Sequence, residues 1–278
     1  MSNPTNPSVW IDGHLVSADA ARVPYDDHGI TVGDGVFETV KLTESGPFAL
    51  SRHLERLRRS ADAMKIPAPS DEVVRAAIAE VVATHEGDGF LRVTLTAGPG
   101  PLGSNRDELT PRLIVAVRPG EVRVAPTTVV LVGYTRNERG ALAGVKSTSY
   151  GENVVALAAA AESGASEALF ANTVGDLCEG TGSNVFVGFG DRLVTPPLHS
   201  GCLDGITRAL LLEAGVGTEQ DIPVNSLGDA TEMFLVSTAR EVQPVTAMGD
   251  LVLPLAPGPL TTRAREVWLE RVAERLDP

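Results

Sequence analysis

The sequence predicts an α+β chain folded as two domains, and three observations indicate this class. A length of 278 residues with 43% hydrophobic content is enough to bury one large core or two moderate ones. Strand-like and helix-like patterns occur in both halves of the chain, and the stretch RPGEVRVAPT between them has the prolines and glycine of a linker. We therefore expect an N-terminal α/β domain over 1–120, a linker over 121–127 and a C-terminal domain over 128–278.

The first domain is expected to begin with two hairpins. The segments VWIDGHLVSA and GVFETVKLTESGPFAL each alternate apolar residues around an Asp-Gly or Ser-Gly turn. Two helices should follow near Ser51 and Ser70, because each serine is a plausible N-cap and apolar residues then recur at three- and four-residue steps. The apolar runs FLRVTLTAG and PRLIVAV predict two further strands.

The second domain is expected to contain both strands and helices. The run of alanine, valine and leucine in GENVVALAAAAESG predicts a buried helix. Around it we expect strands at TVVLVGYT, EALFAN and EMFLVST, a hairpin at SNVFVGFGDRLVTPP, a short helix at ITRALLLEAG and a closing helix at TTRAREVWLERVAERL. No internal repeat or low-complexity segment interrupts this order.

The charge balance excludes several classes of partner. A formal charge of −13 argues against nucleic-acid or anionic-membrane surfaces, because both require clustered lysine and arginine. No apolar stretch approaches membrane-spanning length, and the start MSNPTNPSVW lacks the pattern of a signal peptide, so the cytoplasm is the expected location. Cys178 and Cys202 are expected to be free packing residues, and their spacing leaves open whether they approach each other.

Three short stretches carry candidate chemistry. Lys146 precedes the alanine-rich helix, and local sequence alone favours a solvated loop lysine there. In LDGITRALL, a glycine and a threonine open a helix, which is the geometry of a phosphate site, although such a glycine is more often only a cap. Ser237 and Thr238 in FLVSTAREV offer a second place where hydroxyls and backbone donors converge, or else an ordinary strand end.

Glu179 supplies a carboxylate among small residues in GDLCEGTGSNVFV. A protonated ring nitrogen would suit it as a partner, whereas the alternative is a carboxylate that accepts turn N–H bonds from Gly180 to Ser183. A lysine, a phosphate cradle and a carboxylate together suggest a phosphorylated pyridine aldehyde held as a Schiff base. No metal site is expected.

The combination of motifs is more specific than any one of them. The stretches HGITVGDGVFETVKL, HLERLRRSA, GVKSTSY, DLCEGTGSNVF, LVTPPL and LDGITRALL occur in the order found in class IV, or fold type IV, pyridoxal-phosphate aminotransferases, and the chain resembles that family over nearly its whole length. The family includes branched-chain aminotransferases, D-amino-acid aminotransferases and aminodeoxychorismate lyases. The resemblance implies a smaller N-terminal α/β domain and a larger C-terminal domain with a barrel-like sheet that binds pyridoxal 5′-phosphate.

The resemblance also implies roles for individual residues. Lys146 matches the catalytic lysine that holds the cofactor, Glu179 the acid at the pyridine nitrogen, and Arg56 the arginine that reaches the phosphate. The remaining cofactor-binding residues implied are Tyr150, Gly205, Ile206, Thr207, Ser237 and Thr238. A homodimer is implied too, with the cofactor between the domains and a loop of one N-terminal domain closing the neighbour's site.

The substrate is less well determined by the motifs. Candidate substrate-binding residues are Phe37, Lys41, Arg92, Leu102 and Ala239. Where D-amino-acid aminotransferases carry an arginine and a histidine that grip the substrate carboxylate, this chain has Leu102 and Ser104. This departure argues against an ordinary D-amino-acid aminotransferase and predicts weaker carboxylate capture, with a wider range of amines accepted. We expect a transaminase between an amino acid and a 2-oxo acid, with a D-amino acid still favoured and a branched-chain L-amino acid or a primary (R)-amine as further donors.

Two other functions compete with transamination. Aminodeoxychorismate lyases share the GDG stretch and much of the rest, but they release pyruvate and 4-aminobenzoate from 4-amino-4-deoxychorismate. A binding protein that kept the scaffold without the activity would have lost the lysine or the carboxylate, and both are present here.

Overall fold

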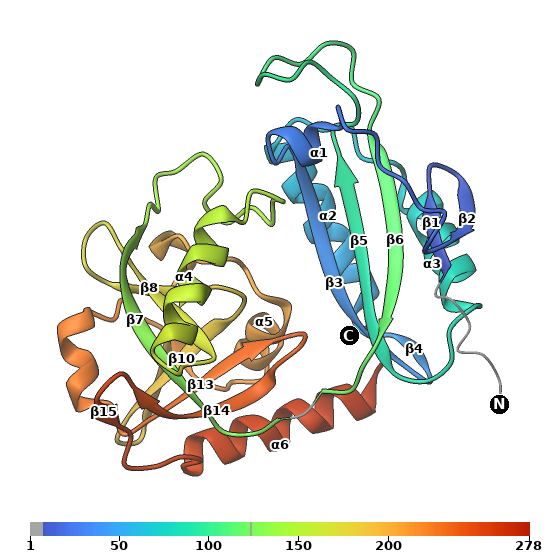
Figure 1. The fold of residues 1–278 in the computed structure, drawn as a ribbon. Coiled ribbons are helices and arrows are strands. Elements are labelled where there is room, and N and C mark those ends of the chain that lie inside the picture. Colours follow the sequence, from blue (N-terminus) through green and yellow to red (C-terminus); the bar gives the residue numbers. More distant parts are fainter. Residues whose placement is uncertain (1–7, 123) are drawn as a thin grey trace. The chain divides into compact units, whose positions relative to one another are not determined.

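The computed structural model describes residues 8–122 and 124–278, which form two compact units (Figure 1). Within the described chain, the first unit contains the residues up to Glu121 together with Val145–Tyr150 and Leu276–Pro278, and the second contains the rest. The chain therefore returns to the first unit at Val145–Tyr150, inside the span expected for the C-terminal domain. The expected linker, 121–127, includes position 123, which lies outside the described residues.

The first unit is built on an antiparallel sheet. Its strand order is β2-β1-β6-β5-β3-β4, with bounds β1 Ser8–Ile11, β2 His14–Ser17, β3 Gly35–Thr43, β4 Gly46–Pro47, β5 Gly89–Thr96 and β6 Arg112–Pro119. Both predicted hairpins are confirmed. In the first of them, Asp12 and Gly13 have φ angles of 48° and 89°, which are the positive values that a tight hairpin turn requires.

Three helices accompany this sheet: α1 His28–Thr31, α2 Leu50–Ala63 and α3 Asp71–Val82. Apolar residues of α2 and α3 share one core with β3, β5 and β6, which confirms both longer helices. Ser70 caps α3, since its Oγ accepts the Val73 N–H at 3.4 Å. Ser51 does not cap α2. The cap is Ala49 in a left-handed conformation, and the Ser51 hydroxyl donates instead to Asp277.

The second unit contains the larger, mixed sheet, which is the barrel-like sheet expected there. Its order is β12-β11-β10-β13-β14-β7-β8-β9, with β15 paired to β14. The bounds are β7 Thr127–Arg136, β8 Glu167–Asn172, β9 Leu177–Gly180, β10 Asn184–Phe189, β11 Arg192–Thr195, β12 Thr218–Glu219, β13 Glu232–Ser237, β14 Glu241–Met248 and β15 Leu251–Val252. Strands β9 and β14 were not predicted, because β9 is short and glycine-flanked and β14 contains Pro244.

The helices of the second unit are α4 Gly151–Glu162, α5 Ile206–Glu213 and α6 Pro259–Glu274, joined by 3₁₀ turns at Leu198–Ser200 and Val224–Asp229. The prediction that α4 is buried is wrong for most of its surface. Ala156 and Ala160 are buried, whereas Val154 is 65% exposed and Val155 is 53% exposed. Small residues suffice for the face packed on β7 and β8, and the other face remains open to solvent.

Cys178 and Cys202 are both free and buried, and they share one apolar cluster with Phe170. Their expected packing role is confirmed. No helix within residues 8–122 and 124–278 is long and apolar enough to cross a membrane. In the same residues, no group of histidine, cysteine and acidic side chains is arranged to hold a metal ion.

Candidate active site

Lys146 is held by its backbone on the first unit. Its carbonyl accepts the Phe37 N–H of β3 at 3.0 Å, and its N–H donates to Ser60 Oγ of α2 at 3.2 Å. The adjacent Ser147 forms a β-bridge with Val36. The residue is half-buried, so it is a positioned lysine rather than the solvated loop residue that local sequence favours.

Three of the predicted site residues surround the ring of a fourth, Phe37. The Lys146 Nζ lies 4.4 Å from the centre of the Phe37 ring, and the Arg92 guanidinium carbon lies 4.1 Å from it. Tyr150 packs edge-on against Phe37, with ring centres 5.1 Å apart. Arg92 and Phe37 share a face of the sheet, because Arg92 lies opposite Thr39 in the β3–β5 register.

Lys41 belongs to the same face of β3 as Phe37, four residues further along the strand, where it is half-buried. Leu102, by contrast, lies on the loop after β5 and is 69% exposed. The first unit therefore gathers Phe37, Arg92, Lys146 and Tyr150, while Leu102 extends from a separate loop.

Arg56 is bound to a buried acid on the opposite face of β3. Its Nε and Nη2 donate to the two carboxylate oxygens of Glu38 at 2.7 and 2.8 Å, and His53 Nδ1 lies 2.7 Å from Glu38 Oε2. Burial alone would raise the pKa of Glu38, but the charge and hydrogen bonds of Arg56, together with His53, hold that pKa well below its usual range. Burial lowers the pKa of His53, and Glu38 opposes that shift.

The Glu38–His53–Arg56 set was not recognised as a unit from sequence, although two signals were available. Glu38 interrupts a strand that is otherwise suited to burial, and a buried carboxylate requires partners. His53 and Arg56 are three residues apart on α2 and so share a helix face.

Glu179 lies on β9 of the second unit beside two donors. Its Oε2 accepts the Leu203 N–H at 2.9 Å, and its Oε1 lies 3.7 Å from Arg136 Nε. That Nε is buried and has no hydrogen-bond partner among the described residues, while the guanidinium stacks over Phe170 at 4.3 Å. Arg136 was missed because it ends a strand far from Glu179 in sequence.

The turn after Glu179 uses other acceptors. The Thr181 N–H donates to Glu167 Oε1 at 3.0 Å, and the Gly180 N–H donates to the Ser183 carbonyl at 2.7 Å. The buried Glu167 thus accepts hydrogen bonds from Thr181 and Ser183, and the N–H groups of Gly180 and Thr181, which the sequence offers as alternative partners for Glu179, are bound to other acceptors.

The two predicted phosphate segments lie at one end of the second sheet. Gly205 is the N-cap of α5. Because glycine has no side chain, it cannot accept a hydrogen bond from the first-turn N–H groups of Ile206 and Thr207. A Cβ on Gly205 would lie 1.9 Å from Asn184 Oδ1. Asn184 opens β10 and pairs with Val236, the residue before Ser237.

Asn184 connects these segments to the acid, and sequence reasoning missed it. Its Nδ2 donates to the Leu203 carbonyl at 2.9 Å, and the Leu203 N–H donates to Glu179. Ser237 Oγ accepts the Arg240 N–H at 3.1 Å, which closes the turn that contains the half-buried Thr238 and the exposed Ala239. The second unit therefore gathers Glu179, Gly205 to Thr207 and the end of β13.

Comparison with known proteins adds a family and several relatives. The family model described as amino-transferase class IV matches residues 35–248. The D-alanine aminotransferase of Bacillus licheniformis is 30% identical over 91% of this chain and 93% of its own, and the aminodeoxychorismate lyase of Bacillus subtilis is 28% identical over 87% of each. The solved branched-chain amino acid aminotransferase from Thermobaculum terrenum in its PLP form is 25% identical with a TM-score of 0.87, over 97% of this chain and 95% of that one.

Proposed function

Because the chain belongs to the class IV aminotransferases, which are pyridoxal-phosphate enzymes, we propose that it moves an amino group between a small or apolar amino acid and a 2-oxo acid. The observation that carries the proposal is the placement of Lys146. Its backbone is fixed by β3 and α2, and its ammonium lies beside Phe37 and Tyr150 with Arg92 nearby. A lysine held in this way suits attachment to a cofactor and proton transfer.

The residues of the second unit fit pyridoxal phosphate. The uncapped N-terminus of α5 offers N–H donors for a phosphate, and the close approach of Asn184 to Gly205 leaves room only for glycine. The orphaned Arg136 Nε beside Glu179 marks a charged site that the described residues leave incompletely satisfied. When bound, the cofactor supplies an electron sink for the substrate α-carbon.

The predicted site residues would bind the cofactor at its ring nitrogen and phosphate and would move the substrate proton. Glu179 would accept a hydrogen bond from the pyridine N–H and keep the proton on that nitrogen. Ile206, Thr207 and Thr238 would hold the phosphate, with Arg56 as a further phosphate contact and Ser237 supporting the turn. The Lys146 amine would take the proton from the substrate α-carbon and return it in the second half of the cycle.

The predicted substrate preference rests on the cations near Phe37. Arg92 is the candidate for the substrate α-carboxylate, because it is solvent-exposed and its guanidinium stacks on the Phe37 ring that the Lys146 ammonium also contacts. Leu102 adds an apolar group on the loop after β5. We propose D-amino acids as the favoured donors, with branched-chain L-amino acids or a primary (R)-amine accepted less well, and pyruvate or 2-oxoglutarate as acceptors.

Lyase activity is the second candidate. Its support is the aminodeoxychorismate lyase relative, which matches over 87% of both chains. The same lysine and acid would serve that reaction, so the choice between the two functions depends on the substrate pocket.

Lys146→Ala tests the assignment of the lysine. The variant is expected to fold, to lose turnover, and to retain no cofactor on the polypeptide after borohydride reduction, because no other residue is proposed to attach it. The wild-type chain treated in parallel should carry the label at Lys146. A variant that still became labelled would contradict the assignment.

Single-turnover half-reactions test the substrate. The cofactor absorbance of the wild-type enzyme should bleach with D-alanine, and less readily with L-leucine or an (R)-amine. A parallel assay would follow pyruvate release from 4-amino-4-deoxychorismate. Rapid pyruvate release without an added acceptor, together with no bleaching by any amino acid, would establish the lyase and exclude the transaminase.

We further propose that the enzyme is a cytoplasmic homodimer in which a loop of one first unit closes the neighbour's site. The exposed apolar side chains of α4, Val154, Val155 and Leu157, are consistent with a surface that a second copy covers. Light scattering should give twice the chain mass of 29.1 kDa. A fully active monomer would contradict the proposal.

A further inference from the structure

The loop between β5 and β6, residues 97–111, is longer than most connections between strands. Most of its central residues are exposed, and Arg106 is its one basic residue. Such a loop can bring a positive charge to a ligand only if that charge is not already engaged.

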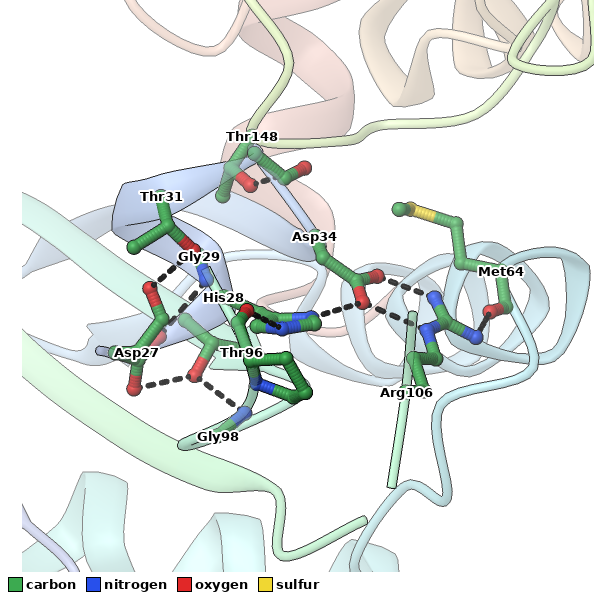
Figure 2. Close-up of polar contacts among 12 residues, drawn as sticks. Asp27, His28, Gly29, Thr31, Asp34, Met64, Thr96, Gly98, Arg106 and Thr148 are labelled. Atoms are coloured by element: carbon green, nitrogen blue, oxygen red, sulfur yellow. Dashed lines mark hydrogen bonds and ion pairs between the residues drawn. The ribbon is translucent and has the colours of Figure 1, made fainter. Parts of the chain in front are cut away.

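Arg106 is fully engaged by the first unit (Figure 2). Its Nε donates to Asp34 Oδ2 at 2.7 Å, its Nη2 donates to Asp34 Oδ1, and its Nη1 donates to the Met64 carbonyl at 2.8 Å. Asp34 is buried, at 7% exposure, in the segment between α1 and β3. A two-pronged pair with a buried carboxylate is among the strongest contacts an arginine can make.

His28 joins the same carboxylate to the start of the loop. Its Nε2 lies 2.8 Å from the Pro101 carbonyl, and its Nδ1 lies 3.4 Å from Asp34 Oδ2. A Cβ on Gly100 would lie 2.4 Å from the ring, so the loop backbone packs directly against His28.

Asp27 secures the beginning of the loop. Its Oδ2 accepts the Thr96 hydroxyl at 3.0 Å, and the Thr96 Oγ1 in turn accepts the Gly98 N–H at 3.2 Å. Loop residues 98, 101 and 106 are therefore all tied to the segment 27–34 (Figure 2).

These contacts leave the loop with no uncompensated positive charge. Asp34 neutralises Arg106, and the neighbouring Asp107 and Glu108 are acidic and exposed. To meet a substrate carboxylate, Arg106 would have to give up its bonds to Asp34 and Met64, and a buried Asp34 would then be left without that cation.

We propose that Asp34 is a specificity-determining residue: by sequestering Arg106 it withholds the loop's cation from substrates and favours acceptors with one carboxylate over those with two. The inference rests on the proposed transaminase function. The clamp adjoins the segment that carries Lys146, because Gly33 and Gly35, on either side of Asp34, accept hydrogen bonds from Ser149 and Thr148. It predicts that pyruvate is a better acceptor than 2-oxoglutarate, since the second carboxylate of 2-oxoglutarate finds no free cation on this loop.

Asp34→Asn is the direct test, because it keeps the side-chain shape and removes the charge that holds Arg106. The ratio of kcat/KM for 2-oxoglutarate to that for pyruvate should rise by roughly tenfold, the effect of one newly available charge pair. Asp107→Asn is the matched control, since it also removes one negative charge but leaves the bonds of Arg106 to Asp34 and Met64 in place, and its ratio should stay at the wild-type value.

Arg106→Gln completes a double-mutant cycle. Alone it should leave the ratio unchanged, and in combination with Asp34→Asn it should abolish the rise. The single Arg106→Gln variant also tests the proposal if Asp34→Asn folds poorly. A fall in 2-oxoglutarate use on Arg106→Gln would mean that Arg106 already serves the substrate, and the proposal would be overturned.

Trypsin cleavage after Arg106 gives a readout that needs no activity. The wild-type bond should resist cleavage, and Asp34→Asn should be cut faster there, whereas Asp107→Asn should not. Faster cleavage with an unchanged acceptor ratio would show that the clamp exists but does not set specificity, which overturns the proposal. A wild-type enzyme that transaminates neither acceptor would instead overturn the proposed function.

Discussion

At the scale of single residues, buried acids orient the cations of the first unit. Glu38 holds Arg56 through both carboxylate oxygens, and Asp34 holds Arg106 in the same way. A carboxylate removed from water is stable only with partners of this quality. The acids therefore set the direction of each guanidinium, and with it the direction in which a ligand can be bound.

Burial shifts the pKa values of the two cysteines upwards, whereas the pKa of Glu38 is lowered. The nearby cations do not fully offset the effect of burial on the thiols. Burial raises the pKa of Cys202 to about 11 and that of Cys178 well above its usual range. At pH 8 both sulfurs should therefore be protonated thiols with little reactivity.

We predict that the native protein reacts slowly with a disulfide reagent such as DTNB at pH 8. The chain contains 2 cysteines, and both should react rapidly once the protein is unfolded in guanidinium chloride. The variants Cys178→Ser and Cys202→Ser assign any residual rate to one thiol. A thiol that reacts at the unfolded rate in the native protein would show that burial does not protect it.

At the scale of elements, the N-terminus of helix α5 packs against a side chain of strand β10. Asn184 of β10 occupies the space where a side chain on Gly205 would lie, and it is tied to the Leu203 carbonyl. The glycine has an ordinary φ of −72°, so its requirement is one of space rather than of backbone conformation.

Gly205→Ala should therefore displace Asn184 and tilt the first turn of α5. We expect a loss of stability of about 1–3 kcal/mol from overpacking, and weaker binding of pyridoxal phosphate. Thermal unfolding of the cofactor-free protein measures the first effect, and titration with the cofactor measures the second.

Gly228→Ala is the matched control for this prediction. A Cβ at Gly228 would meet nothing within 4 Å, and the residue lies in the 3₁₀ turn Val224–Asp229. Its stability and cofactor affinity should be unchanged. Equal behaviour of the two variants would show that the contact with Asn184 is unimportant.

At the scale of the whole molecule, stability should fall on acidification. The folded pKa of Glu38 is depressed, so its contribution is present above the ordinary glutamate pKa of about 4.3 and is lost as the pH falls below it. The folded pKa of His53 is also lowered. Below its ordinary value of about 6.5, the unfolded chain takes up a proton that the native protein does not.

We predict that the free energy of unfolding, measured with urea from about pH 8 to about pH 3, declines in two stages. The first stage should begin near pH 6.5 with a slope of at most about 1.4 kcal/mol per pH unit for one proton, and the second below about pH 4.3. His53→Gln should remove the first stage and Glu38→Gln should weaken the second. A stability that rises between pH 7 and pH 5 would contradict the assignment.

The sequence by itself determined the features that depend on neighbours along the chain. The hairpin at Asp12 and Gly13 and the Ser70 cap of α3 follow from residues within a few positions of one another. The family was also determined at this level, because its motifs are short and occur in a set order. Lys146 and Glu179 are identified by these motifs alone.

Only the tertiary structure decided how distant residues combine. Asp34 and Arg106 are 72 positions apart, and Asn184 meets Leu203 from a different element. Ala49 rather than Ser51 caps α2, and Lys146 joins the first unit through bonds to Phe37 and Ser60. Local propensity cannot specify such pairs, because burial and long-range register decide which charges meet and which backbone groups need a partner.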